Sequence, residues 1–145
     1  MLLPYKLFFK LEIRMDDNVN GTHYHPYGEL SVNIGSLSVN QGVRMWKVNL
    51  HPATAIKAFP IGQSYFAPEY TYSFNEVESF GQNGQIYLYG KVIDYRESIS
   101  SQVIGSVNDD LFQAKDILNN GVTYQYPQPT IHGYYIKVTL RLKKL

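Results

Sequence analysis

The stretch Gln85-Ile-Tyr-Leu-Tyr-Gly-Lys-Val-Ile-Asp-Tyr95 decides the fold class of this chain. Successive side chains of a β-strand point to opposite faces, and both faces of this segment carry apolar bulk. The apolar positions are Ile86, Leu88 and Val92 on one side and Tyr87, Tyr89 and Ile93 on the other. We therefore expect a central strand of an all-β domain, with its even positions in the core and its tyrosines on the opposite side. That opposite side is either packed under the second sheet or forms a binding surface, and the sequence leaves this choice open.

The two ends of the chain show the clearest one-sided alternation. From Tyr5 to Met15 every odd position is apolar, and from Tyr134 to Leu142 every even position is apolar. A period of two over this length predicts strands that bury one face. Because these patterns are the strongest in the chain, we expect the first and last strands to flank each other or pair within one sheet.

The rest of the chain consists of shorter strand patterns and turn formers. Asn108 to Leu118 is the exception and predicts a helix, capped by Asn108 or Asp109 and buried through Leu111, Ala114 and Leu118. The sum predicts one domain, residues 1–145, built as an antiparallel β-sandwich of the jelly-roll or C2-like type. We expect about seven or eight strands and one short helix near 109–118.

Composition excludes several classes of protein. The chain has 145 residues with 13 basic and 12 acidic side chains, and the absence of a basic stripe argues against a nucleic-acid partner. It has no cysteine, which excludes disulfides and thiolate metal sites. No apolar run reaches the roughly 20 residues of a membrane span, and charged residues interrupt the N-terminal segment, so no signal peptide is visible. We expect a soluble protein, with secretion left open.

The strongest compositional bias is towards tyrosine, with 13 residues of this type. Tyrosine combines a wide apolar ring with a polar tip, which suits recognition surfaces. It also packs well in any sheet, so the bias alone does not separate a binding surface from a core. The candidate ligand-binding residues lie in the loop near residue 25 or on the odd face of the central strand: Tyr24, Tyr27, Tyr87, Tyr89 and Tyr95.

His23, His25 and Glu29 form the first candidate metal site. Alternate residues of an extended segment point to the same side, so two imidazoles and a carboxylate could converge on a transition metal. The pattern resembles the first motif of the cupin family, G-x5-H-x-H-x3-E-x6-G, which implies a jelly roll holding iron, manganese or zinc. Tyr65 stands where the second cupin motif has a histidine. The alternative is a pair of surface-loop histidines.

A set of acidic residues forms a second candidate metal site, for calcium. Calcium prefers several oxygen ligands, and the loops at one end of a sandwich can supply them. The segment from Gly90 to Ser98 is similar to the corresponding part of C2 domains, which implies calcium held by paired acids in separate loops. Solvated turn residues are the alternative. The candidate ligands are Asp16, Asp17, Asp94, Asp109 and Asp110.

A third likeness covers most of the chain. The segment Tyr27-Gly-Glu-Leu-Ser-Val-Asn33, the single tryptophan Trp46 and the run ending at Tyr95 resemble the β-sandwich modules that end some bacterial cytolysins. This resemblance implies a toxin-associated, lectin-like module that attaches a larger protein to a membrane or a glycan.

The predicted function is a non-enzymatic recognition module that binds a glycan, a membrane surface or a protein through tyrosines and end loops. No Gly-x-Ser-x-Gly elbow or phosphate-binding loop is present, so no catalytic residue is assigned. Two alternatives remain open. One is a cupin-like metalloprotein, and the other is a structural or assembly subunit that forms oligomers through its edge strands.

Overall fold

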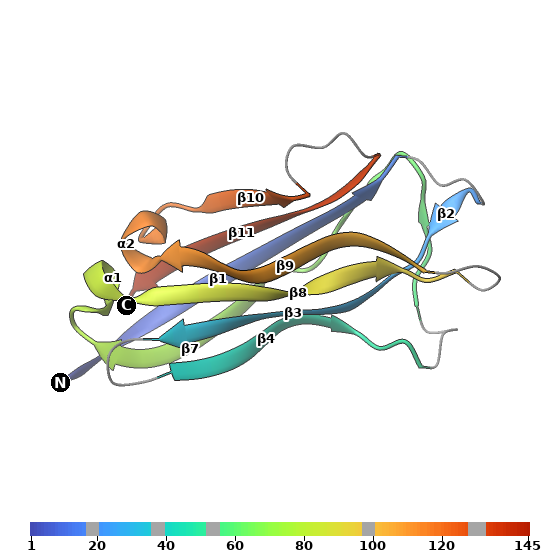
Figure 1. Cartoon of the computed structure of the whole chain (residues 1–145). Helices are drawn as coiled ribbons and strands as arrows, with labels where there is room; N and C mark the ends of the chain where they lie inside the picture. The colour runs from blue at the N-terminus through green and yellow to red at the C-terminus, as the bar shows by residue number, and fades with distance from the viewer. Residues whose placement is uncertain (17–20, 36–39, 52–55, 97–100, 128–132) are drawn as a thin grey trace.

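Two antiparallel sheets pack against each other in the computed structural model, which describes residues 1–16, 21–35, 40–51, 56–96, 101–127 and 133–145 (Figure 1). The first sheet consists of β1 (Leu2–Met15), β6 (Ser64–Phe66), β7 (Tyr70–Val77), β10 (Val122–Tyr126) and β11 (Tyr134–Lys144). The second consists of β3 (Pro26–Gly35), β4 (Asn40–Val48), β8 (Gln85–Asp94) and β9 (Gln102–Gln113). A small ladder joins β2 (His23–Tyr24) and β5 (Phe59–Pro60). The predicted all-β antiparallel sandwich is confirmed.

The first sheet is built around β1. On one side β1 pairs with β11 in an unbroken register from Tyr5 opposite Lys144 to Met15 opposite Tyr134. The expected pairing of the first and last strands is therefore confirmed. On the other side two strands share the edge of β1, because β7 pairs with its first part and β6 with Glu12 to Arg14.

The second sheet is built around β8, which lies between β3 and β9. Its even residues Ile86, Leu88 and Val92 are fully buried, as the alternation predicts. At Gly90 the backbone has a φ of +127°, and a Cβ there would collide with the carbonyl oxygen of Glu29 on β3. The close approach of the two strands therefore requires glycine at this position.

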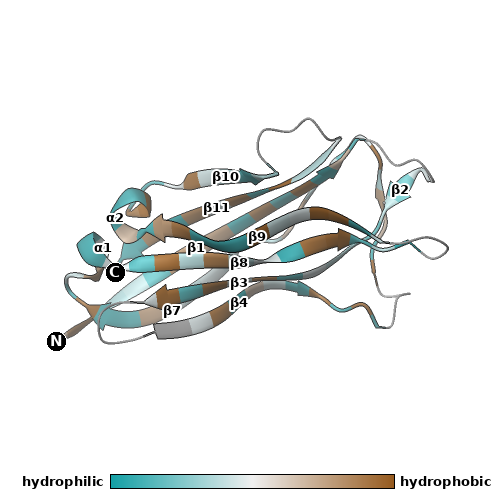
Figure 2. Cartoon of the chain, viewed as in Figure 1, coloured by the Kyte–Doolittle hydropathy of each residue, from teal (hydrophilic) through white to brown (hydrophobic). Residues whose placement is uncertain are grey.

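One hydrophobic core fills the space between the sheets. Figure 2 shows hydrophobic and hydrophilic residues alternating along much of β8 and β3, and Ile86, Leu88 and Val92 of β8 face this core with Leu30, Val32 and Ile34 of β3. The terminal strands contribute the densest rows, namely Tyr5, Leu7, Phe9, Leu11, Ile13 and Met15 from β1 and Ile136, Val138, Leu140 and Leu142 from β11.

The predicted short helix near 109–118 is present but is shorter than the sequence suggests. Residues 109–113 continue strand β9, and only α2 (Ala114–Ile117) is helical. Residues 109–113 form a strand because Phe112 then packs in the core, with its ring centroid 4.5 Å from that of Tyr124. A helix over these residues would have buried Leu111 instead. A second short helix, α1 (Phe80–Asn83), precedes β8, and the Ala114 amide donates to the Gly84 carbonyl beside it. Neither helix in the described residues is long and apolar enough to cross a membrane.

Candidate functional site

The odd residues of β8 form the centre of the candidate site. They alternate with the buried even positions, so they lie on the outer face of the four-stranded sheet. Tyr89 is 37% exposed, and Tyr87 is half-buried, with its hydroxyl donating to the side chain of Gln85 at 3.2 Å. The structure therefore places these two tyrosines outside the core.

Apolar and aromatic neighbours extend this row at the far end of β8. Ile93 lies opposite Tyr27 of β3 and opposite Val103 of β9, and Val103 is 42% exposed. The ring of Tyr27 meets that of Tyr95 edge to face, with centroids 6.3 Å apart. We call this surface the tyrosine face and define it by Tyr27, Tyr87, Tyr89, Ile93, Tyr95 and Val103.

Loosely paired charges lie beside the tyrosine face. The carboxylate of Glu29 lies 3.7 Å from Nε of Arg44 and 4.0 Å from Nζ of Lys47, and Ser31 donates to it at 3.3 Å. Glu29 also stands opposite Lys91 in the register of β3 and β8. Exposed ion pairs of this length contribute little to folding, so these charges are free to rearrange when a partner approaches.

Tyr24 is not a surface residue, and its assignment as a ligand contact is wrong. Its side chain is fully buried, and its single hydroxyl proton is shared between the carbonyl oxygens of Ile13 at 3.0 Å and Gln63 at 2.7 Å. Burial raises the pKa of Tyr24 to about 12. Tyr24 is a core residue that joins β1 to the segment before β6.

The structure does not assemble the cupin-like site. His23 is exposed in β2, with Nδ1 2.8 Å from the hydroxyl of Thr22, whereas Glu29 lies beside the tyrosine face with Arg44 and Lys47. His25 is half-buried, and its backbone amide donates to Asp94 at 2.8 Å. Among the described residues no group of three or more His, Asp or Glu side chains is placed to hold a metal ion.

The acidic residues proposed for calcium are dispersed. Asp94 is fully buried and paired with Arg96 at 3.2 Å, and Asp16 pairs with Arg14 at 2.9 Å. Asp110 lies opposite Leu88, which is six residues along β8 from Asp94, a separation of about 20 Å at the rise of a strand. Calcium ligands must all lie within about 2.6 Å of the ion, so these acids do not form one site.

The remaining acids of that set have other surroundings. Asp109 is exposed and has a positive φ of 46° at an irregularity in the β8–β9 ladder. Asp110 accepts a hydrogen bond of 2.6 Å from the hydroxyl of Tyr126, and burial together with this bond raises the pKa of Tyr126. Asp17 lies outside the described residues.

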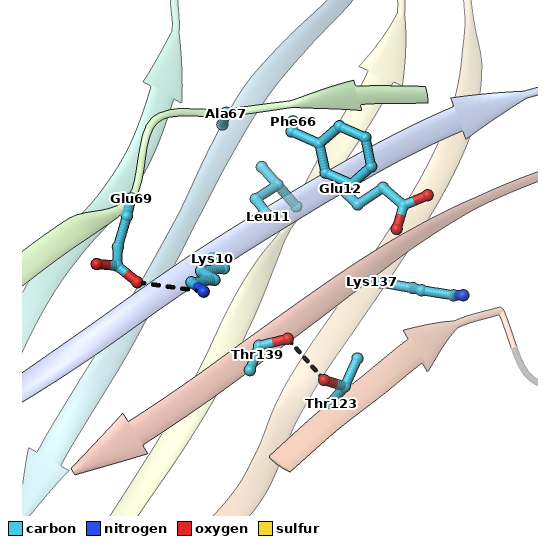
Figure 3. A pocket seen from close by; sticks show the side chains of 9 residues that line it. All are labelled: Lys10, Leu11, Glu12, Phe66, Ala67, Glu69, Thr123, Lys137 and Thr139. Atoms are coloured by element: carbon cyan, nitrogen blue, oxygen red, sulfur yellow. Dashed lines mark hydrogen bonds and ion pairs between the residues drawn. The ribbon is translucent and has the colours of Figure 1, made fainter. Parts of the chain in front are cut away.

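A groove on the outer face of the five-stranded sheet was not predicted from the sequence. Its volume is about 420 Å³, and it opens where the strand beside β1 changes from β7 to β6 (Figure 3). It is lined by Lys10, Leu11, Glu12, Phe66, Ala67, Glu69, Thr123, Lys137 and Thr139. Phe66 sits in a three-residue strand after an irregular stretch, too short for alternation to reveal.

Structural comparison supports the fold. The chain is similar to a chain of the Cry23Aa1 and Cry37Aa1 binary protein complex, with a TM-score of 0.56 and 15% identity over 96% of this chain and 95% of that chain. It also aligns with a C2 domain of a plant extended synaptotagmin 1 at a TM-score of 0.46 and 9% identity, over 100% of this chain and 98% of that one. No protein-family model and no curated protein matches the sequence. At 15% identity the likeness to the chain of the binary complex shows a shared fold alone.

Proposed function

We propose that this chain is a recognition module that binds a protein partner through the tyrosine face. The observation that supports this proposal most directly is the outer row of β8, where Tyr87 and Tyr89 lie outside the core and Tyr89 is 37% exposed. Tyrosine and arginine are enriched at protein interfaces, and truncating them often costs more binding energy than truncating other residues. An ordered sheet also holds these rings with little loss of entropy on binding.

The composition of the surface favours a protein over a membrane. Glu29, Arg44 and Lys47 form a mixed group of charges beside the rings, and Lys91 interrupts the apolar row of β8. A lipid surface would favour a continuous apolar or cationic face, whereas mixed charges suit complementary charges on another protein. The same fold occurs in a chain of a binary protein complex, which makes a protein the first class of partner to test.

Photo-crosslinking tests the proposal while the partner is still unidentified. A photoreactive phenylalanine is placed at Tyr89 and, as the control, at Thr71, which is exposed on the outer face of the five-stranded sheet. In an extract of the producing cells, we expect a discrete crosslinked species from position 89 and none from position 71. Absence of a species specific to position 89 would contradict the proposal.

The captured partner then allows a quantitative test. We expect the double variant Tyr87→Ala, Tyr89→Ala to weaken the complex at least tenfold, which corresponds to about 1.4 kcal/mol. Isothermal titration calorimetry with the purified partner measures this change. Both side chains lie outside the core, so the variant should unfold at nearly the wild-type temperature. An unchanged Kd in a folded double variant would remove the tyrosine face from the interface.

A further inference from the structure

We propose that the groove on the five-stranded sheet binds a short, uncharged oligosaccharide, with the ring of Phe66 as the platform for one sugar ring. This site goes beyond the proposed function, because it lies on the other sheet and takes a different class of ligand. Its volume of about 420 Å³ falls within the roughly 300–1,000 Å³ of small-molecule sites.

The aromatic platform is the first element of the site. Phe66 is 68% exposed and stands opposite Glu12 in the register of β6 and β1. Figure 3 shows its ring next to the side chain of Glu12, and both residues line the groove. Packing the C–H face of a sugar on this ring would remove apolar surface of both from water.

A fixed carboxylate is the second element. One oxygen of Glu12 accepts hydrogen bonds from the hydroxyl of Ser64 at 2.7 Å and that of Tyr135 at 3.2 Å. Burial, followed by the charge of Glu12, raises the pKa of Tyr135, so this phenol stays protonated and remains a donor. Among the described residues no hydrogen bond reaches the other oxygen, Oε1, which can accept a sugar hydroxyl in a charge-assisted bond.

A pair of hydroxyls on the far side of β1 is the third element. Thr123 and Thr139 face each other across β10 and β11, with their oxygens 2.6 Å apart (Figure 3). Only one proton is used between them, so the pair still offers one O–H donor and free lone pairs. Sugar hydroxyls both donate and accept, which matches this arrangement better than a ligand with acceptors alone.

The balance of charge indicates that the sugar is uncharged. Two lysines and two glutamates line the groove, and Lys10 already lies 3.7 Å from Glu69. Nearby Arg14 is bound to Asp16, and the guanidinium of Arg141 stacks 3.8 Å from the ring centre of Phe8. A phosphate or sulfate group would meet the Glu12 carboxylate without an excess of free cations around it.

Titration with defined trisaccharides tests the site. The probes are maltotriose, cellotriose, mannotriose and triacetylchitotriose, added to isotopically labelled full-length protein at millimolar concentrations and followed by amide chemical shifts. We expect saturable shifts for at least one probe at Lys10, Glu12, Thr123 and Thr139, and little change on the tyrosine face. Phe66→Ala should weaken that binding about tenfold, and Phe66→Trp should retain it, because the larger ring preserves the platform.

Controls separate this site from general effects. Leu2→Ala removes a side chain that is 57% exposed at the far end of β1, and it should leave the affinity unchanged. Glu12→Gln keeps a hydrogen-bond acceptor but loses the charge, so we expect a smaller loss than for Phe66→Ala. The proposal is overturned if no probe binds, if Phe66→Ala binds as tightly as wild type, or if the shifts map to the tyrosine face. Binding to phosphatidylserine vesicles, without binding to any trisaccharide, would overturn it equally.

Discussion

Tyr24 and Tyr89 are the same residue type with opposite environments. The sequence around Tyr24 is polar, with histidines on both sides, and suggests an exposed loop. The ring is buried because β2 pairs with β5, which follows more than 30 residues later, and because Phe59 of β5 packs against it at 5.8 Å. Local pattern cannot reveal such a contact. By contrast Tyr89 lies in a long regular strand, where alternation places it opposite the even positions; the structure adds that it is 37% exposed, which the sequence leaves open.

The buried phenol of Tyr24 predicts a loss of stability in alkali. Its pKa is raised to about 12 in the folded protein and has its ordinary value of about 10 when unfolded. Below pH 10 both states are protonated and the contribution to stability is complete. Between about pH 10 and 12 only the unfolded state releases the proton, so the free energy of unfolding falls as the pH rises. Urea unfolding from pH 9 to 12 measures this slope.

The variant Tyr24→Phe separates this effect from the other tyrosines. At neutral pH we expect it to destabilise the protein by about 1–2 kcal/mol, because the buried carbonyl of Ile13 and the part-buried carbonyl of Gln63 lose the phenol proton that they share. Above pH 10 its slope should be shallower than that of wild type. Tyr70→Phe, at a position 41% exposed, is the control and should keep the wild-type slope. Parallel curves for wild type and Tyr24→Phe would contradict the assignment.

At the scale of elements, long strands are predictable and short ones are not. β1, β8 and β11 follow from alternation alone, because each carries a complete row of core side chains. Residues 108–113 are predicted as helix because Asn108, Asp109 and Asp110 are typical of a helix N-terminus, but they belong to strand β9. The strand is preferred through packing with Tyr124, and the positive φ of Asp109 accommodates the irregular ladder. Both are tertiary effects.

Two alanine variants distinguish the strand from the helix. In the strand Phe112 is 2% exposed, so Phe112→Ala should destabilise the protein by about 3–5 kcal/mol. Leu111 is half-buried on the opposite face, across from Tyr87, and Leu111→Ala should cost about 1 kcal/mol. A helix over 109–118 would reverse this order, since Leu111 would then line its buried face. Equilibrium denaturation of the two variants decides between them.

At the scale of the molecule, the strands that pair with β1 determine two features. Its pairing with β11 joins the two ends of the chain in one sheet, and its pairing with β6 and β7 forms the groove. That the terminal strands pair could be predicted from their one-sided patterns. That β6 and β7 share the other edge of β1 could not, because β6 has only three residues and Pro68 interrupts the segment between them. The groove lies at this junction, so it could not be predicted without β6. Tyr87 and Tyr89 could be named as candidates from the sequence because they lie on a long strand.

The central place of β11 predicts that the chain folds as one unit. β11 lies between β10 and β1 and buries Ile136, Val138, Leu140 and Leu142 completely. Each such side chain contributes about 1.5–3 kcal/mol, so their sum is comparable to the whole stability of a domain, about 5–15 kcal/mol. A fragment of residues 1–133 should therefore lack a cooperative thermal transition and native near-ultraviolet circular dichroism.

Removal of the last two residues alone is the matched control for this truncation. Lys144 and Leu145 are exposed, and deleting Leu145 breaks the hydrogen bond from its amide to the Pro4 carbonyl, so residues 1–143 should fold with only a small loss of stability. Adding a synthetic peptide of residues 134–145 to the fragment 1–133 should restore the near-ultraviolet signal, because the open edges of β1 and β10 offer the ladder it occupies. A cooperative transition in 1–133 alone would contradict the prediction, because it would show that the two sheets fold without β11.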